Sequence, residues 1–174
     1  MDKYVGDRHD VRVHNKLFPS NFRMLIVGPS GHGKTCLLMR MLLEDNLLNY
    51  DKLYVFARSL YQHQYQCLKA GLENEKKKKN IITLLNAHEY MRKNGVELND
   101  IAESIREIND ENEVEPNHVE SEFHETQDDI PDPKDLDMSN RTIIVFDDIM
   151  DMKKQITPEM YYTRGRSANC DCVY

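Results

Sequence analysis

One octapeptide in this sequence has the residue types and spacing to hold the phosphate groups of a nucleotide. It is Gly28-Pro29-Ser30-Gly31-His32-Gly33-Lys34-Thr35, and it matches the P-loop (Walker A) pattern G-x-x-x-x-G-K-[ST] at every fixed position. Glycines let a loop wrap closely around an anion with its N–H groups pointing inward, and a helix beginning here directs its positive dipole end at that anion. In such loops the lysine reaches the β- and γ-phosphates and the threonine hydroxyl binds Mg²⁺. The segment from Gly28 to Cys36 is therefore the predicted binding site for ATP with Mg²⁺, in which His32 is an incidental loop residue.

Two carboxylates farther along the chain could complete the chemistry. Asp147 and Asp148 end the apolar, β-branched run that begins at Thr142, which is typical of a strand. In P-loop ATPases such a strand delivers an aspartate (Walker B) that helps hold Mg²⁺, and we predict this role for Asp147. Asp148 then lies where a carboxylate could polarise or deprotonate an attacking water. With water as the acceptor, the predicted reaction is ATP hydrolysis, with Lys34 and Mg²⁺ stabilising the charge on the γ-phosphoryl group.

Sites of this kind usually also need an arginine, often supplied by a neighbouring subunit, which accelerates GTPases about 10³- to 10⁵-fold. The candidates are Arg164 and Arg166, which flank Gly165. Contact with nucleic acid and plain surface charge are equally good interpretations of these two side chains.

The elements that must position these residues indicate an α/β protein. A strand at 22–27 precedes the glycine loop, a helix is expected at 34–48, a second strand at 52–57 and a helix at 60–71. Residues 81–85 are a strand or a helix, 86–108 have helical spacing, and a further strand begins at 170. Lys34 and Asp147 are 113 residues apart, which leaves room for two intervening strands. The predicted fold is a P-loop NTPase of the additional-strand type, a three-layer α/β/α sandwich with a mostly parallel sheet.

The charge of the chain is divided unevenly. The net charge is −7, but residues 97–137 carry −14, which leaves +7 for the remainder. An acidic average therefore does not argue against a nucleic-acid partner. The 174 residues fit one domain. We expect an N-terminal arm at 1–20 and a core at 21–174, with an acidic, largely disordered insertion at about 109–139 that Pro116, Pro131 and Pro133 interrupt.

Cysteine usage and hydropathy indicate an intracellular protein. The four cysteines are few and irregularly spaced, and Cys170 and Cys172 are too close for a usual zinc pair, so all four are predicted to be reduced thiols. No segment approaches the roughly 20 apolar residues that cross a bilayer, and the first residues are too charged for a signal peptide. We therefore expect no membrane partner.

Three segments in this order, FRMLIVGPSGHGKT, TIIVFDDIM and YYTRGRSANCDCVY, resemble the poxvirus-type genome-packaging ATPases. These enzymes belong to the FtsK–HerA superfamily and also occur in Polinton (Maverick) transposons. The resemblance runs from about residue 18 to the last residue, apart from the acidic insertion. It implies a homo-oligomeric ring, such as a hexamer, that hydrolyses ATP and drives double-stranded DNA into a capsid. It likewise implies capsid proteins as partners, and a location in the cytoplasm or nucleus of a host cell or in a virion.

Two departures from that family leave three interpretations open. The family usually has arginine-histidine where this chain has Arg166-Ser167, and its next strand ends in a polar sensor, commonly glutamine, whereas this sequence ends at Tyr174. We therefore expect a C-terminally truncated copy with an incomplete sheet. The first interpretation is an ATPase of the DNA-packaging type. The second is a non-catalytic nucleotide-binding or assembly remnant, which the lost sensor favours. The third is a small-molecule kinase, although the sequence shows neither an arginine-rich lid nor a substrate pocket.

Overall fold

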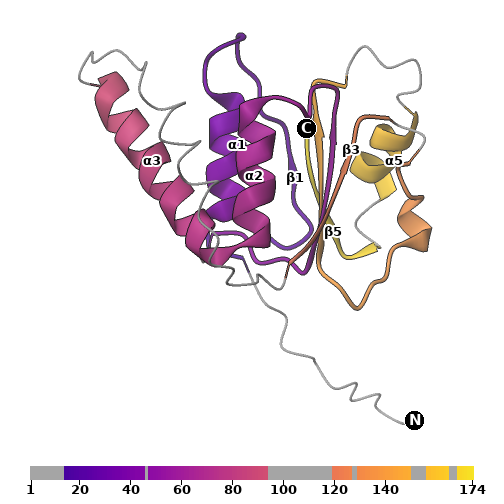
Figure 1. The fold of residues 1–174 in the computed structure, drawn as a ribbon. Coiled ribbons are helices and arrows are strands. Elements are labelled where there is room, and N and C mark those ends of the chain that lie inside the picture. Colours follow the sequence, from indigo (N-terminus) through magenta and orange to yellow (C-terminus); the bar gives the residue numbers. More distant parts are fainter. Residues whose placement is uncertain (1–13, 46, 94–118, 127–128, 150–155, 165–167) are drawn as a thin grey trace, which may run out of the picture.

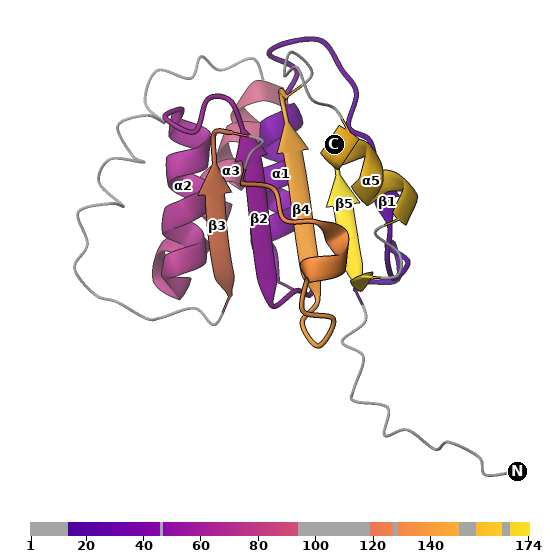
Figure 2. The same cartoon turned by 90° about the vertical axis from the view of Figure 1, so that its right-hand side faces the viewer.

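The structure, a computed structural model, describes residues 14–45, 47–93, 119–126, 129–149, 156–164 and 168–174. Parallel strands form a five-stranded sheet in the order β1-β5-β4-β2-β3 (Figure 2). The strands are β1 (Arg23–Met24), β2 (Lys52–Ala57), β3 (Glu120–His124), β4 (Thr142–Asp147) and β5 (Cys170–Val173). The helices are α1 (Lys34–Leu43), α2 (His63–Glu73), α3 (Glu75–Lys93), the short 3₁₀ helix η1 (Pro133–Asp135) and α5 (Ile156–Arg164).

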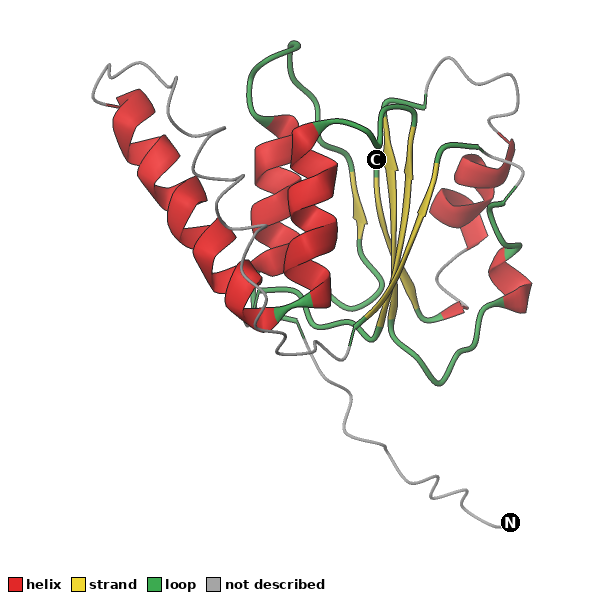
Figure 3. Cartoon of the chain, in the orientation of Figure 1, coloured by secondary structure: helices red, strands yellow, loops and turns green. Residues whose placement is uncertain are grey.

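Helices cover both faces of the sheet. The first three helices pack on one face, and α5 lies with η1 on the other (Figures 1 and 3). The central strands are apolar on both sides, as buried parallel strands must be. In β2, Leu53 and Val55 pack toward the first three helices, whereas Tyr54 and Phe56 join a second core with Tyr161 of α5. The predicted α/β class with a parallel sheet is thus confirmed, and the layers are compatible with an α/β/α sandwich.

The strand order brings two distant segments to one edge of the sheet. β5 pairs with β1 on one side and with β4 on the other, all in parallel. Because parallel strands share a direction, their carboxyl ends meet at the same edge. The glycine loop (28–33) follows β1, and Asp147 ends β4. Both therefore lie at the end of the sheet where the carboxyl ends of its strands meet, here called its carboxyl edge. This is the edge at which open α/β sheets bind their ligands.

Most of the predicted elements are present, with changes at their ends. The strand at 52–57 is found with those bounds, the helix expected at 34–48 ends at Leu43, and 81–85 belongs to α3. The strand expected at 22–27 is reduced to two residues, although its pairing continues through a hydrogen bond from Ile26 N to Tyr174 O. Leu25 and Val27, which follow this edge strand, are 62% and 81% exposed. Residues 94–108, for which helical spacing was predicted, lie outside the described part.

The acidic segment is more ordered than predicted. Residues 109–118 and 127–128 lie outside the described part, but the expected disorder is wrong for the remainder, which contains β3 and η1. Two features stabilise β3 despite its acidic residues. Lys52 on the neighbouring strand pairs with Glu122 at 2.9 Å and with Glu120 at 3.7 Å, and Phe123 packs against the core. The carboxylates of an edge strand are thus placed beside a cation, so that the strand can pair.

The last residues of the predicted arm are also part of the fold. Residues 1–13 are outside the described part, but His14 is only 4% exposed. Its Nε2 donates to Asp171 Oδ2 at 2.8 Å, because the backbone N–H of Asn49 donates to Nδ1 at 3.0 Å and thereby fixes the proton on Nε2. The chain is therefore anchored to β5 before β1 begins.

Candidate functional site

The glycine loop has a backbone that only glycine adopts readily at two positions. A turn closes from His32 N to Pro29 O at 3.4 Å, and within it Gly31 has φ of 75°. Gly33 has φ of 82° and is the N-cap of α1. Both values lie in the left-handed region. The N-cap makes no side-chain hydrogen bond and the first turn of α1 has no acidic residue, so the N–H groups of that turn remain for an anion.

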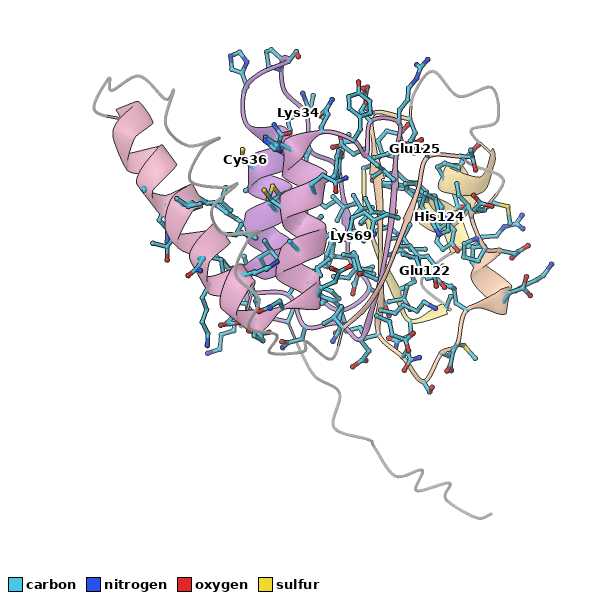
Figure 4. All side chains as sticks on the ribbon, in the orientation of Figure 1. Lys34, Cys36, Lys69, Glu122, His124 and Glu125 are labelled. Carbon is cyan, nitrogen blue, oxygen red and sulfur yellow. The ribbon has the colours of Figure 1, made fainter. Side chains whose placement is uncertain are left out.

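Lys34, the first residue of α1, reaches back over the loop. Its Nζ donates to Gly28 O at 2.9 Å and to Pro29 O at 3.1 Å. Figure 4 shows Lys34 with Cys36 at the end of α1 that follows the loop. The ammonium group is therefore held among backbone carbonyls that are weaker partners than a phosphate would be.

Lys34 and Asp147 line one small pocket of about 20 Å³, which is room for a water molecule. The other residues of its wall are Ile26, Leu38, Val145, Phe146, Val173 and Tyr174. A cation from one end of the sequence and a carboxylate from the other thus meet at the carboxyl edge of the sheet. The pairing of these two residues was predicted from their motifs, and the structure brings them together.

A tyrosine that the sequence analysis missed contacts the carboxylate. Tyr65, in the first turn of α2, donates its hydroxyl hydrogen bond to Asp147 Oδ2 and is only 4% exposed. Burial, followed by the hydrogen bond and the negative charges of Asp147 and Asp148, raises the pKa of Tyr65 far above its usual value. The phenol therefore stays protonated and acts as a donor at neutral pH. A tyrosine on the inner face of a helix gives no sequence signal beyond core packing.

The other predicted acid is placed differently. Asp148 is exposed and has φ of 54°, a left-handed conformation that turns the chain so that Ile149 enters the second core. Asp148 is not among the described residues that line the pocket of Lys34 and Asp147. Its carboxylate is exposed to solvent next to Asp147, at the carboxyl end of β4.

The structure does not bring Arg164 to Lys34 and Asp147. This side chain is exposed at the end of α5, on the other layer, and Arg166 lies outside the described residues. A crossover helix runs antiparallel to the strands that it joins, so the last turn of α5 lies toward the amino end of β5. On that layer, hydrogen bonds from Lys134 lower the pKa of Asp132, and the positive charge of Arg164 lowers it further.

The predicted metal ligands fit an ion that arrives with a nucleotide. In the described part of the chain, no group of three or more His, Cys, Asp or Glu residues could hold a metal ion. Thr35 and Asp147 offer one hydroxyl and one carboxylate, both oxygen donors of the kind that Mg²⁺ prefers. Mg²⁺ usually keeps several waters and binds through one or two protein oxygens together with substrate phosphates. The chemistry of these two donors is therefore compatible with Mg²⁺ bound to phosphates.

All four cysteines are free, as predicted. Cys67, Cys170 and Cys172 are buried, and burial raises the pKa of each thiol, that of Cys172 to about 12. Cys36, beside Thr35 at the glycine loop, is partly exposed.

These exposures predict that one cysteine reacts much faster than the other three. Iodoacetamide at pH 8 should label Cys36 in the folded chain, and the remaining thiols only after denaturation, because a thiolate is the reactive species. Mass spectrometry of timed samples measures the order of labelling. A Cys36→Ser chain should lose the fast phase, and rapid labelling of Cys170 or Cys172 in the folded protein would contradict the burial of β5.

Comparisons of the chain with protein-family models, with curated proteins and with solved structures found no match. In the described residues, no helix combines the length and the apolar character that crossing a membrane requires. The chain itself has an α/β fold with a parallel sheet, and the carboxyl edge of this sheet carries a glycine loop, a lysine and a carboxylate.

Proposed function

We propose that this chain is a P-loop ATPase of the additional-strand type, which binds ATP with Mg²⁺ and hydrolyses it. The observation that carries the proposal is the shared pocket of Lys34 and Asp147 at the carboxyl edge of the sheet. The glycine loop matches its pattern at every fixed position, whereas an apolar run that ends in two aspartates is weak evidence alone. The shared pocket links the weaker motif to the stronger one. Two strands, β2 and β3, also separate α1 from β4 in the chain, which agrees with the two intervening strands for which the spacing of Lys34 and Asp147 leaves room.

Each part of the site has a role in this chemistry. The N–H groups of the glycine loop and of the first turn of α1 bind the phosphate oxygens. Lys34 exchanges the carbonyls of Gly28 and Pro29 for the β- and γ-phosphates, which are stronger acceptors. Thr35 and Asp147 would hold Mg²⁺, which would neutralise charge on the phosphates. Asp148 orients the water that attacks in line with the leaving group.

The resemblance to genome-packaging ATPases supports double-stranded DNA as the substrate that is moved, and a ring of copies as the working assembly. The placement of Arg164 away from its own pocket agrees with an arginine supplied by a neighbouring copy. Capsid proteins are the corresponding partners, in a host cell or a virion. The intact set of Lys34, Thr35, Asp147 and Asp148 favours the enzyme over the non-catalytic nucleotide-binding remnant.

The test is Mg²⁺-dependent ATP hydrolysis by the purified chain, with and without double-stranded DNA. Protection of Cys36 from iodoacetamide by Mg²⁺ and ATP gives a binding readout that does not need turnover. Hydrolysis that rises with DNA and disappears in an Asp147→Asn chain supports the packaging ATPase. Protection without hydrolysis moves the assignment to a non-catalytic nucleotide-binding module. A folded chain that ATP does not protect and that turns over no ATP refutes the proposal.

A further inference from the structure

The hydroxyl of Tyr65 is hydrogen-bonded to one oxygen of Asp147, the carboxylate proposed as a Mg²⁺ ligand. It donates to Asp147 Oδ2, which leaves Oδ1 as the oxygen that can face an ion or its water shell. The tyrosine ring is buried in the core between the sheet and the first three helices. A carboxylate at the end of a strand can otherwise rotate about both of its side-chain bonds. The hydrogen bond therefore selects one orientation.

The segment that carries Tyr65 is itself fixed relative to Asp147. Ala57, the last residue of β2, is paired with Asp147 across the two strands. From there to α2 the backbone is held by local hydrogen bonds, from Gln62 N to Ser59 O at 3.0 Å and from Tyr65 N to Gln62 O at 3.1 Å. Asp147 thus ends β4, and Tyr65 is joined to the neighbouring strand β2 by a short, hydrogen-bonded connection.

We propose that Tyr65 is a positioning residue, which orients the Asp147 carboxylate so that Oδ1 faces Mg²⁺ when ATP is bound. The inference rests on the proposed function and adds to it a residue that lies in neither motif. Tyr65 touches neither the nucleotide nor the ion in this scheme, and acts through Asp147. Its effect should therefore appear in the Mg²⁺ dependence of ATP binding, and not in the affinity for ATP without metal.

The test compares the full chain with Tyr65→Phe, which keeps the buried ring and removes only the hydroxyl. The measurement is binding of a fluorescent ATP analogue, first in excess EDTA and then as a function of Mg²⁺ concentration. We expect the Mg²⁺ concentration that gives half of the maximal increase in analogue binding to rise about tenfold. This is the size expected for the loss of about one hydrogen bond to a charged group. Binding of the analogue in EDTA should change less than about twofold, because the loop and Lys34 are intact.

Tyr161→Phe is the matched control. Tyr161 is also buried and donates its hydroxyl hydrogen bond to Pro131 O at 2.7 Å, but on the opposite face of the sheet. Tyr161→Phe should lower thermal stability about as much as Tyr65→Phe does, but it should leave the Mg²⁺ dependence of analogue binding unchanged. An unchanged Mg²⁺ dependence in Tyr65→Phe overturns the inference alone, as does an equal loss of binding with and without metal. If the parent chain binds no nucleotide, the proposed function fails first and the inference fails with it.

Discussion

Replacing Lys34 by alanine is expected to weaken ATP binding at least about a hundredfold and to abolish hydrolysis, while the chain stays folded. A hundredfold loss corresponds to about 2.7 kcal/mol, which is within the range of charge-assisted hydrogen bonds. The fold should tolerate the change, because the two hydrogen bonds of Nζ go to carbonyls of an exposed loop that water can replace. Titration with a fluorescent ATP analogue, with thermal unfolding beside it, separates these two effects.

Lys69→Ala is the control for this substitution. Lys69 lies on the exposed side of α2, away from the glycine loop (Figure 4), so its removal changes the net charge equally and leaves the site intact. ATP affinity should then stay within about twofold of the parent, since screened surface charges contribute little. If Lys34→Ala binds ATP as tightly as Lys69→Ala does, Lys34 does not contact the phosphates and the loop is a structural turn.

The parts of this molecule that could be predicted from sequence are those with a local signal. The glycine loop is specified by eight consecutive residues, and its two left-handed positions are occupied by Gly31 and Gly33. The apolar run of β2 has equally local causes, because a strand buried on both faces needs apolar residues throughout. Even the meeting of Lys34 with Asp147 follows from local motifs, once the strands are known to be parallel.

The parts that could not be predicted depend on partners far away in the chain. β3 is acidic and borders on disorder by composition, and it is stabilised by Lys52, which no local pattern connects with it. Tyr65 looks like any tyrosine on the inner side of a helix until Asp147 is placed beside its hydroxyl. The position of Arg164 away from Lys34 and Asp147 follows from the direction of α5, which the sequence around Gly165 does not reveal.

Replacing Asp171 by alanine is expected to give the largest loss of stability, about 3–5 kcal/mol in the free energy of unfolding. Asp171 is fully buried and accepts three hydrogen bonds. The donors are Phe22 N at 2.8 Å, His14 Nε2 at 2.8 Å and Arg141 Nε at 3.4 Å. Alanine would leave these donors buried without their acceptor, one of them on a charged guanidinium group, and each unmet donor is costly.

The loss should be specific to this buried network. Asp45→Ala removes an exposed carboxylate that pairs with Lys78 at 2.6 Å, and such surface pairs are worth at most about 1 kcal/mol. Urea unfolding followed by circular dichroism measures both variants, and a lower midpoint at an unchanged slope reports a change in stability alone. Asp171 accepts hydrogen bonds from His14 in the N-terminal segment, from Phe22 just before β1 and from Arg141 just before β4, so one carboxylate joins three parts of the chain near the amino ends of the strands. If Asp171→Ala is no less stable than Asp45→Ala, then these contacts do not hold the N-terminal segment on the sheet.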